Sequence, residues 1–132
     1  MNAYGGGISD LWCAPGGGVE RGTSLPANLI REGIEVHAFN QRSVAGILAM
    51  IRRLGAMVGA AEQAEVLAAG YEARLAVLAA VVRDHRPRVW FEEWDEPLIS
   101  GIGWVSELIG IAGGQDIFAD KAREQGAKNR IV

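Results

Sequence analysis

The chain has 132 residues, of which 49% are hydrophobic and 22% charged, a balance typical of one globular domain with a core. Its formal net charge of −3 argues against nucleic acid as a partner, because phosphate binding needs a clustered positive surface. Cys13 is the single cysteine, which excludes an internal disulfide, and with only His37 and His85 beside it no Cys/His metal site is expected.

The first residues do not resemble a signal peptide, because residues 1–4 carry no basic segment and no apolar run follows them. No stretch approaches the roughly 20 apolar residues that a membrane span needs. Taken as given, the sequence therefore predicts a cytoplasmic chain. Residues 1–24 are rich in glycine and aperiodic, and they predict an irregular leader in which residues 8–12 alone have packing potential.

A short helix is expected from Leu25, because Ser24 is a suitable N-cap and Pro26 fits the first helical turn. Gly33 is well placed to end this helix in a left-handed conformation. The β-formers that follow, in residues 34–39, predict a strand.

Two longer helices come next. Residues 44–58 follow Ser43, a good N-cap, and place apolar side chains at helical spacing. Residues 61–85 are rich in alanine and carry a stripe of large apolar side chains at spacings of four and three: Leu67, Tyr71, Leu75, Leu78 and Val82. This helix would be about 35 Å long, which is more than a crossover over one small sheet needs. A helix of this length can instead connect two lobes.

The stretch from residue 88 to residue 101 is the most informative. It begins as a buried strand over residues 88–92 and continues into a loop dense with aromatic and acidic side chains, in which Pro97 cannot donate a ladder hydrogen bond. Loops at the carboxyl ends of strands are where α/β proteins bind ligands. The alternative is a solvated acidic turn with Trp94 packed into the core.

The last part of the chain predicts one helix, over residues 104–112, ended by two glycines. Residues 115–118 are expected to be a short connection. Residues 119–132 are polar and charged, and we expect them to be poorly ordered apart from a strand or turn at residues 131–132. The alternation of strands and helices predicts an α/β fold with parallel strands, although two expected strands are few for a sheet.

No catalytic or metal-binding constellation is present in the sequence. The glycine runs at residues 5–7 and 16–18 follow no strand and match no phosphate-binding motif. The carboxylates of residues 92–96 lie in one loop and give no sign of the defined separation that glycoside hydrolysis requires. Ser100 and Ser106 lack a nucleophile elbow. The sequence therefore predicts no enzyme.

Two segments carry a family resemblance. Residues 52–59 read R-R-L-G-A-M-V-G, and residues 91–120 include F-E-E-W-D-E-P-L-I-S and E-L-I-G-I-A-G-G-Q-D-I-F-A-D. They resemble the substrate-binding proteins of cobalamin and iron-siderophore ABC importers, over about residues 25–132. The resemblance implies a class III periplasmic-binding-protein fold, in which two Rossmann-like α/β lobes are joined by a long rigid helix and ligand binds between them.

Under this resemblance the chain divides into four parts and is incomplete, because family members begin with a signal peptide and a whole first lobe and continue beyond residue 132. The parts are an irregular leader, a remnant of the first lobe, the connecting helix and the start of the second lobe, at residues 1–24, 25–60, 61–86 and 87–132. The family also implies a periplasmic or membrane-associated location and an ABC permease as partner.

The resemblance implies that Glu93, Trp94 and Asp95 face the cleft, that Trp104 lies nearby, and that Trp12 approaches from the first lobe. Tryptophans offer stacking area to the flat face of a corrin or metal chelate, and carboxylates accept hydrogen bonds from its edge. Acidic side chains suit amide-rich cobalamin or a related corrinoid better than the alternatives, a ferric siderophore or haem. Cobalamin would be the transported ligand, so no cofactor is expected.

Two alternatives from other classes stay open. The chain could be a fragment that binds no ligand and self-associates as a helical module, because apolar stripes left exposed favour homo-oligomers. It could instead be a small hydrolase that uses its acidic loop, in which case Glu93→Gln would abolish turnover.

Overall fold

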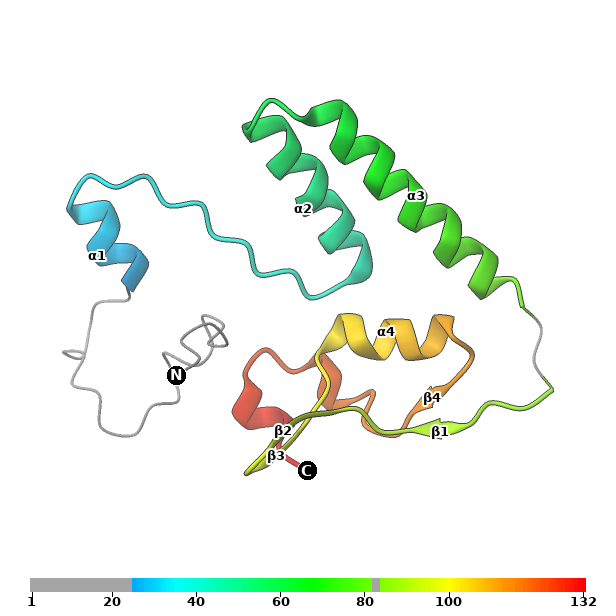
Figure 1. Cartoon of the computed structure of the whole chain (residues 1–132). Coiled ribbons are helices and arrows are strands. Elements are labelled where there is room, and N and C mark those ends of the chain that lie inside the picture. The colour runs from blue at the N-terminus through cyan, green and yellow to red at the C-terminus, as the bar shows by residue number, and fades with distance from the viewer. Residues whose placement is uncertain (1–24, 82–83) are drawn as a thin grey trace. The chain divides into compact units, whose positions relative to one another are not determined.

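The computed structural model describes residues 25–81 and 84–132, which form a helix-rich α/β structure with two small sheets (Figure 1). The chain divides into two compact units, one ending at Phe39 and the other starting at Asn40. None of the helices in the described ranges has the length and apolar character needed to cross a membrane.

The first unit contains α1, Leu25–Arg31, as the sequence predicts. Gly33 ends it with φ of 77°, and the next amide, of Ile34, donates to the carbonyl of Leu29 at 3.0 Å. The predicted cap, Ser24, lies outside the described residues. The predicted strand at residues 34–39 is wrong: the stretch is irregular, because none of the described residues pairs with it, and Ile34 is exposed.

The second unit begins with α2, Val44–Met57, where the sequence predicts a helix. Ser43 is its N-cap and accepts a hydrogen bond from the amide of Gly46 at 3.0 Å. Glu107, from a later helix, accepts a second amide bond at this end, from Val44 at 2.7 Å. A carboxylate here also complements the positive end of the helix dipole.

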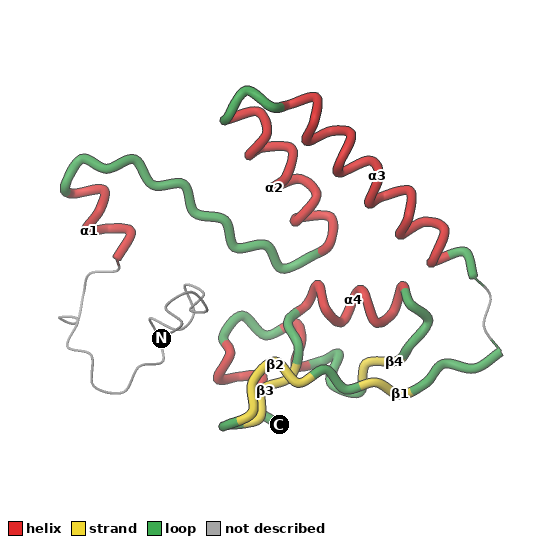
Figure 2. Tube along the Cα trace, in the orientation of Figure 1, coloured by secondary structure: helices red, strands yellow, loops and turns green. Residues whose placement is uncertain are grey.

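Helix α3, Ala61–Ala79, folds back along α2 (Figures 1 and 2). The two helices meet through small residues, and a Cβ placed on Gly55 of α2 would lie 2.2 Å from the Cβ of Ala64. Beside this contact, the Arg52 guanidinium on α2 donates to both carboxylate oxygens of Glu65 and of Glu72, at 2.7 to 3.0 Å. Small residues thus set the distance between the helices, and a polar bridge lies across their edge.

The predicted end of α3 is wrong. The helix ends at Ala79, six residues before the predicted end at residue 85, with the amide of Val81 donating to Leu78 in a tightened last turn. Its buried side chains are Ala64 and Ala68, whereas Leu67, Tyr71 and Leu78 of the large apolar stripe are exposed. The close approach of the two helices explains the difference, because only alanines fit under α2.

The remaining elements form two sheets connected through α4, Gly103–Ile111. Strands β1, Arg88–Val89, and β4, Gln115–Asp116, are parallel, so the predicted parallel α/β connection is confirmed. Strands β2, Glu92–Asp95, and β3, Leu98–Ser100, form an antiparallel hairpin with an irregular register between Glu92 and Trp94. Figure 2 shows both pairs of strands on the same side of α4.

This region corrects four predictions. The predicted strand at residues 88–92 is interrupted and not buried, since Trp90 and Phe91 are exposed. The acidic loop is a hairpin, because β3 supplies the partner that β2 needs. Residues 115–118 include β4, and residues 119–132 contain two short 3₁₀ helices, η2 (Lys121–Arg123) and η3 (Ala127–Arg130). The turn or strand predicted at residues 131–132 is confirmed by a β-bridge between Ile131 and Ile99.

Candidate ligand-binding site

The β2–β3 hairpin presents an aromatic side chain to solvent. Trp94 is 58% exposed, and its indole nitrogen donates to the carbonyl of Glu96 at 3.0 Å. This bond satisfies the polar edge of the ring and ties the ring to the turn, so the exposed remainder is apolar area suited to stacking. Asp95, the next residue on β2, is exposed and lies opposite Leu98 in the hairpin register.

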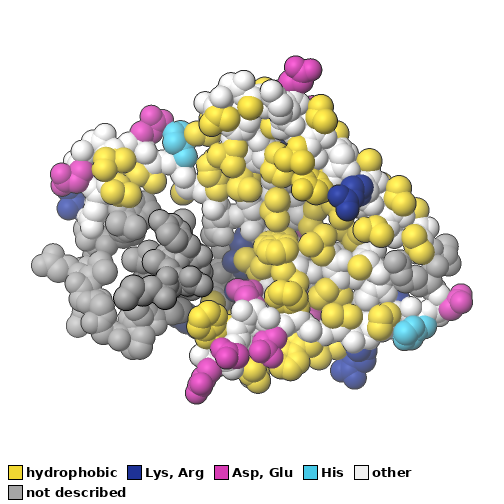
Figure 3. Space-filling view, viewed as in Figure 1, with side chains coloured by type: hydrophobic (Ala, Val, Ile, Leu, Met, Phe, Trp, Pro, Cys, Tyr) yellow, Lys and Arg dark blue, Asp and Glu magenta, His cyan; other side chains and the backbone are white. Residues whose placement is uncertain are grey.

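Further apolar side chains are exposed on and next to the hairpin. Trp90, Phe91 and Leu98 are 42%, 46% and 39% exposed. Trp90 also meets Phe118 edge to face, with ring centres 6.2 Å apart. Figure 3 shows acidic side chains gathered beside apolar ones over the end of the molecule that carries the hairpin. The surface therefore combines aromatic area with hydrogen-bond acceptors.

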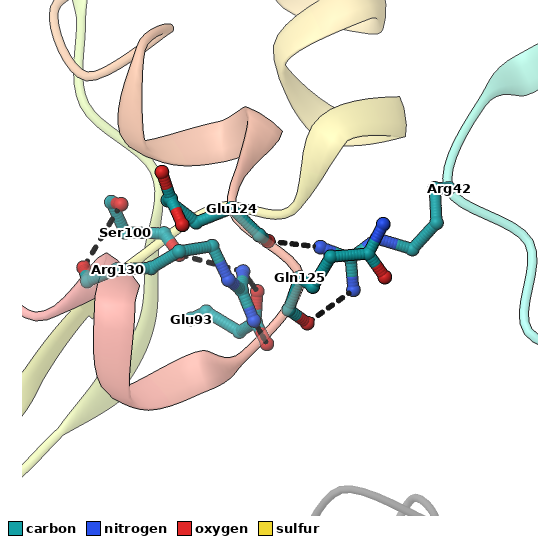
Figure 4. A network of polar contacts seen from close by, with 6 residues as sticks. All are labelled: Arg42, Glu93, Ser100, Glu124, Gln125 and Arg130. Atoms are coloured by element: carbon teal, nitrogen blue, oxygen red, sulfur yellow. Dashed lines mark hydrogen bonds and ion pairs between the residues drawn. The ribbon is translucent and has the colours of Figure 1, made fainter.

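Glu93, the residue before Trp94, is engaged within the protein (Figure 4). Its two carboxylate oxygens accept from the Nη1 and Nη2 atoms of Arg130 at 2.5 and 2.9 Å. The Arg130 side chain is 3% exposed, and Nη1 also donates to the carbonyl of Ser100 at 3.0 Å. In return the Ser100 hydroxyl donates to the carbonyl of Arg130 at 3.1 Å. Glu93 is therefore engaged in an ion pair with Arg130, while part of its side chain stays exposed.

A second arginine secures the segment before η3 (Figure 4). Arg42, just before α2, donates from Nη1 to the carbonyl of Gln125 at 3.1 Å and from Nη2 to the carbonyl of Glu124. Partial burial lowers the pKa of Arg42 from its ordinary value, the positive charge of Arg130 lowers it further, and the negative charge of Glu93 opposes both effects. Arg42 thus connects the start of α2 to the chain that carries Arg130.

An open groove lies elsewhere in the second unit, between the end of α3 and α4, and has a volume of about 650 Å³. Its charged residues already have partners: Arg86 donates to the carbonyl of Gly114 at 2.9 Å, and Glu107 accepts from Val44. Among residues 25–81 and 84–132, no group of three or more His, Cys, Asp or Glu side chains is arranged to hold a metal ion. The hairpin is the better candidate for the site.

Comparison with known proteins decides the family. The model of the periplasmic binding protein family matches residues 19–130. The chain belongs to the periplasmic binding protein family. The structure is similar to that of an ABC transporter substrate-binding protein from Listeria monocytogenes EGD-e, with a TM-score of 0.60 and 18% sequence identity. The alignment covers 76% of this chain and 39% of that one, so the chain spans well under half of the solved protein. No functionally curated protein matches the sequence.

The five residues of this periplasmic binding protein that were predicted to contact ligand do not all lie on the same element. Glu93, Trp94 and Asp95 are consecutive on β2 and all three are exposed, although Glu93 is also in the ion pair with Arg130. Trp104 is half-buried in the first turn of α4, a different element. Trp12 lies outside the described residues. Their contact with ligand stays a prediction.

Sequence reasoning missed Arg130 in this periplasmic binding protein. The residue lies 37 positions from Glu93, in a charged segment that predicted disorder. Only the apolar pair that follows it, Ile131 and Val132, indicated structure at that end. That pair does hold the segment in place: Ile131 bridges to Ile99, and the amide of Val132 donates to the carbonyl of Leu98 at 3.0 Å.

Proposed function

We propose that the chain is the solute-binding component of an ABC importer and that it binds cobalamin or a related corrinoid at the β2–β3 hairpin, without catalysis. The observation that carries the proposal is Trp94, an exposed indole whose nitrogen is already bonded within the hairpin. A corrin presents a broad apolar face with amides at its rim. Trp94 would stack on the face, and Asp95 would accept hydrogen bonds from the amides.

The charge of the hairpin supports a corrinoid over the alternative ligands of the same fold. Glu92, Asp95 and Glu96 are exposed beside Trp94 and make this surface negative. An anionic ferric siderophore or the propionates of haem would meet like charges here, which is unfavourable, whereas uncharged amides would meet acceptors. In the proposed importer the partner is a membrane permease, and the location is periplasmic or at the membrane.

The test is a titration of the chain with cyanocobalamin, followed by tryptophan fluorescence. A parallel titration of free tryptophan at equal absorbance corrects for the light that the ligand absorbs. We expect saturable quenching in the wild-type chain. Trp94→Ala should weaken binding about tenfold, the size expected from losing one aromatic stack of roughly 1.4 kcal/mol. Trp94→Phe, which keeps a stacking ring, should weaken it less. Quenching that Trp94→Ala leaves unchanged would place the ligand elsewhere.

The exposed apolar side chains of α3 favour a second candidate function, self-association. Leu67, Tyr71 and Leu78 lie on one side of the helix and are 43% to 49% exposed. If the chain self-associates, we expect a dimer that forms without ligand and whose fraction rises with protein concentration. Sedimentation velocity measures this fraction. Replacing Leu67 and Leu78 with glutamine should then restore the monomer without altering cyanocobalamin binding.

A further inference from the structure

The guanidinium of Arg130 contacts both strands of the hairpin. It binds Glu93 on β2 through two hydrogen bonds and the carbonyl of Ser100 on β3 through a third. Ser100, 1% exposed, donates back to the Arg130 carbonyl. The planar fork of an arginine holds a carboxylate in one orientation, so these contacts define the position of β2 relative to β3.

Glu93 lies where the hairpin register is irregular. The ladder pairs Glu92 with Ser100 and Trp94 with Ile99, so Glu93 is the extra residue of β2 between them. An extra residue of this kind bends the strand and redirects the side chains next to it. The Arg130–Glu93 pair therefore holds the residue that sets the direction of Trp94 and Asp95.

The Arg130–Glu93 pair fits a positioning role better than a role in overall stability. Arg130 is almost wholly buried and Glu93 is partly exposed, and a charge pair taken out of water contributes little net stability compared with an apolar pair of similar volume. The pair nevertheless fixes one geometry, and it does so immediately before the most exposed aromatic residue of the hairpin.

We infer that Arg130 and Glu93 are positioning residues of the ligand site, that Glu93 does not contact the ligand, and that Asp95 is the carboxylate that accepts its edge hydrogen bonds. This inference rests on the proposed function and divides the neighbouring acids between two tasks. Glu93 orders the hairpin through its ion pair with Arg130, and the carboxylate oxygens of Asp95 accept hydrogen bonds from the amides of a corrinoid.

The experiment compares three variants by two readouts. Residue-resolved hydrogen exchange without ligand reports the order of residues 92–100, and calorimetric titration reports affinity for cyanocobalamin. Glu93→Gln and Arg130→Lys should each speed exchange in residues 92–100 by at least about tenfold and by a larger factor than in α2 and α3, and should weaken binding. Asp95→Ala, which removes both acceptor oxygens, should weaken binding and leave exchange unchanged. The Glu93→Gln/Arg130→Lys double variant should lose less than the sum of the two single variants, because both weaken the same contact.

Two results would overturn the inference. One is a Glu93→Gln chain that loses affinity while its hairpin exchanges at the wild-type rate, since Glu93 would then touch the ligand. The other is an Asp95→Ala chain with full affinity. If circular dichroism shows that Arg130→Lys does not fold, Ser100→Ala removes one bond of the same network without changing charge and should speed exchange in the same residues.

Failure of the proposed function is distinguishable from failure of the inference. If the wild-type chain binds no cyanocobalamin, the corrinoid proposal and the role of Asp95 fail together. The exchange of residues 92–100 in Glu93→Gln still decides whether the Arg130–Glu93 pair orders the hairpin. Unchanged exchange there contradicts the positioning role, whatever the ligand.

Discussion

Replacing Gly55 with alanine tests how α2 and α3 pack. The added Cβ would lie 2.2 Å from the Cβ of Ala64 and 2.9 Å from the carbonyl oxygen of Ala60. Apolar carbons pack at about 3.5–4.0 Å, so the helices must separate by more than about 1 Å. Overpacking of this kind costs about 1–3 kcal/mol, and contact with backbone places it near the upper end. The better helix propensity of alanine returns about 1 kcal/mol. We expect Gly55→Ala to lower the free energy of unfolding by about 1–2 kcal/mol.

The matched control is Gly70→Ala on α3, where an added Cβ would meet no heavy atom within 4 Å. This variant should raise the free energy of unfolding by up to about 1 kcal/mol through helix propensity alone. Urea unfolding followed by far-ultraviolet circular dichroism measures both. Ala64→Gly removes the shorter of the two contacts, so Gly55→Ala should cost less in the Ala64→Gly background than in the wild-type chain. Equal stabilisation by Gly55→Ala and Gly70→Ala would refute the packing described here.

Two further predictions concern the second unit. Hydrogen bonds from Arg52 lower the pKa of Glu65 and of Glu72 below the ordinary 4.5. The two ionised carboxylates therefore stabilise the fold above pH 4.5, and this stabilisation is lost as the pH falls through the lowered pKa values. Arg52→Gln should therefore flatten the acid side of the pH–stability profile measured by urea unfolding, and an unchanged profile would contradict the bridge. Gly103→Ala should lower the melting temperature, because its Cβ would lie 2.6 Å from the backbone carbonyl oxygen of Arg42. Gly110→Ala on the same helix would meet nothing within 4 Å and should not lower the melting temperature.

Local signals in the sequence predicted α1, α2 and α4 well. Ser43 and the apolar spacing after it are sufficient to define α2, and the glycine pair after α4 marks its end. The face that α3 buries could not be predicted in the same way. It depends on the absence of a side chain at Gly55, in another helix, and the larger apolar stripe was the more obvious pattern.

Strands were harder to predict, because a strand depends on a partner that is distant in the sequence. Residues 34–39 contain β-formers but pair with none of the described residues. The acidic stretch contains charges and a proline, yet it forms β2 and its turn because it pairs with β3 and because Arg130 binds Glu93. The family resemblance predicts residues 93–95 as ligand contacts, whereas the ion pair of Glu93 is visible only when Arg130 is placed beside it.

The central claim is that the chain binds a corrinoid at the hairpin, and equilibrium dialysis of cyanocobalamin against the folded chain tests it most directly. We predict excess cobalt on the protein side that saturates at one ligand per chain, with a clear decrease for Trp94→Ala and little change for Gly110→Ala. Equal cobalt concentrations on both sides of the membrane, with circular dichroism showing a folded chain, would contradict the claim.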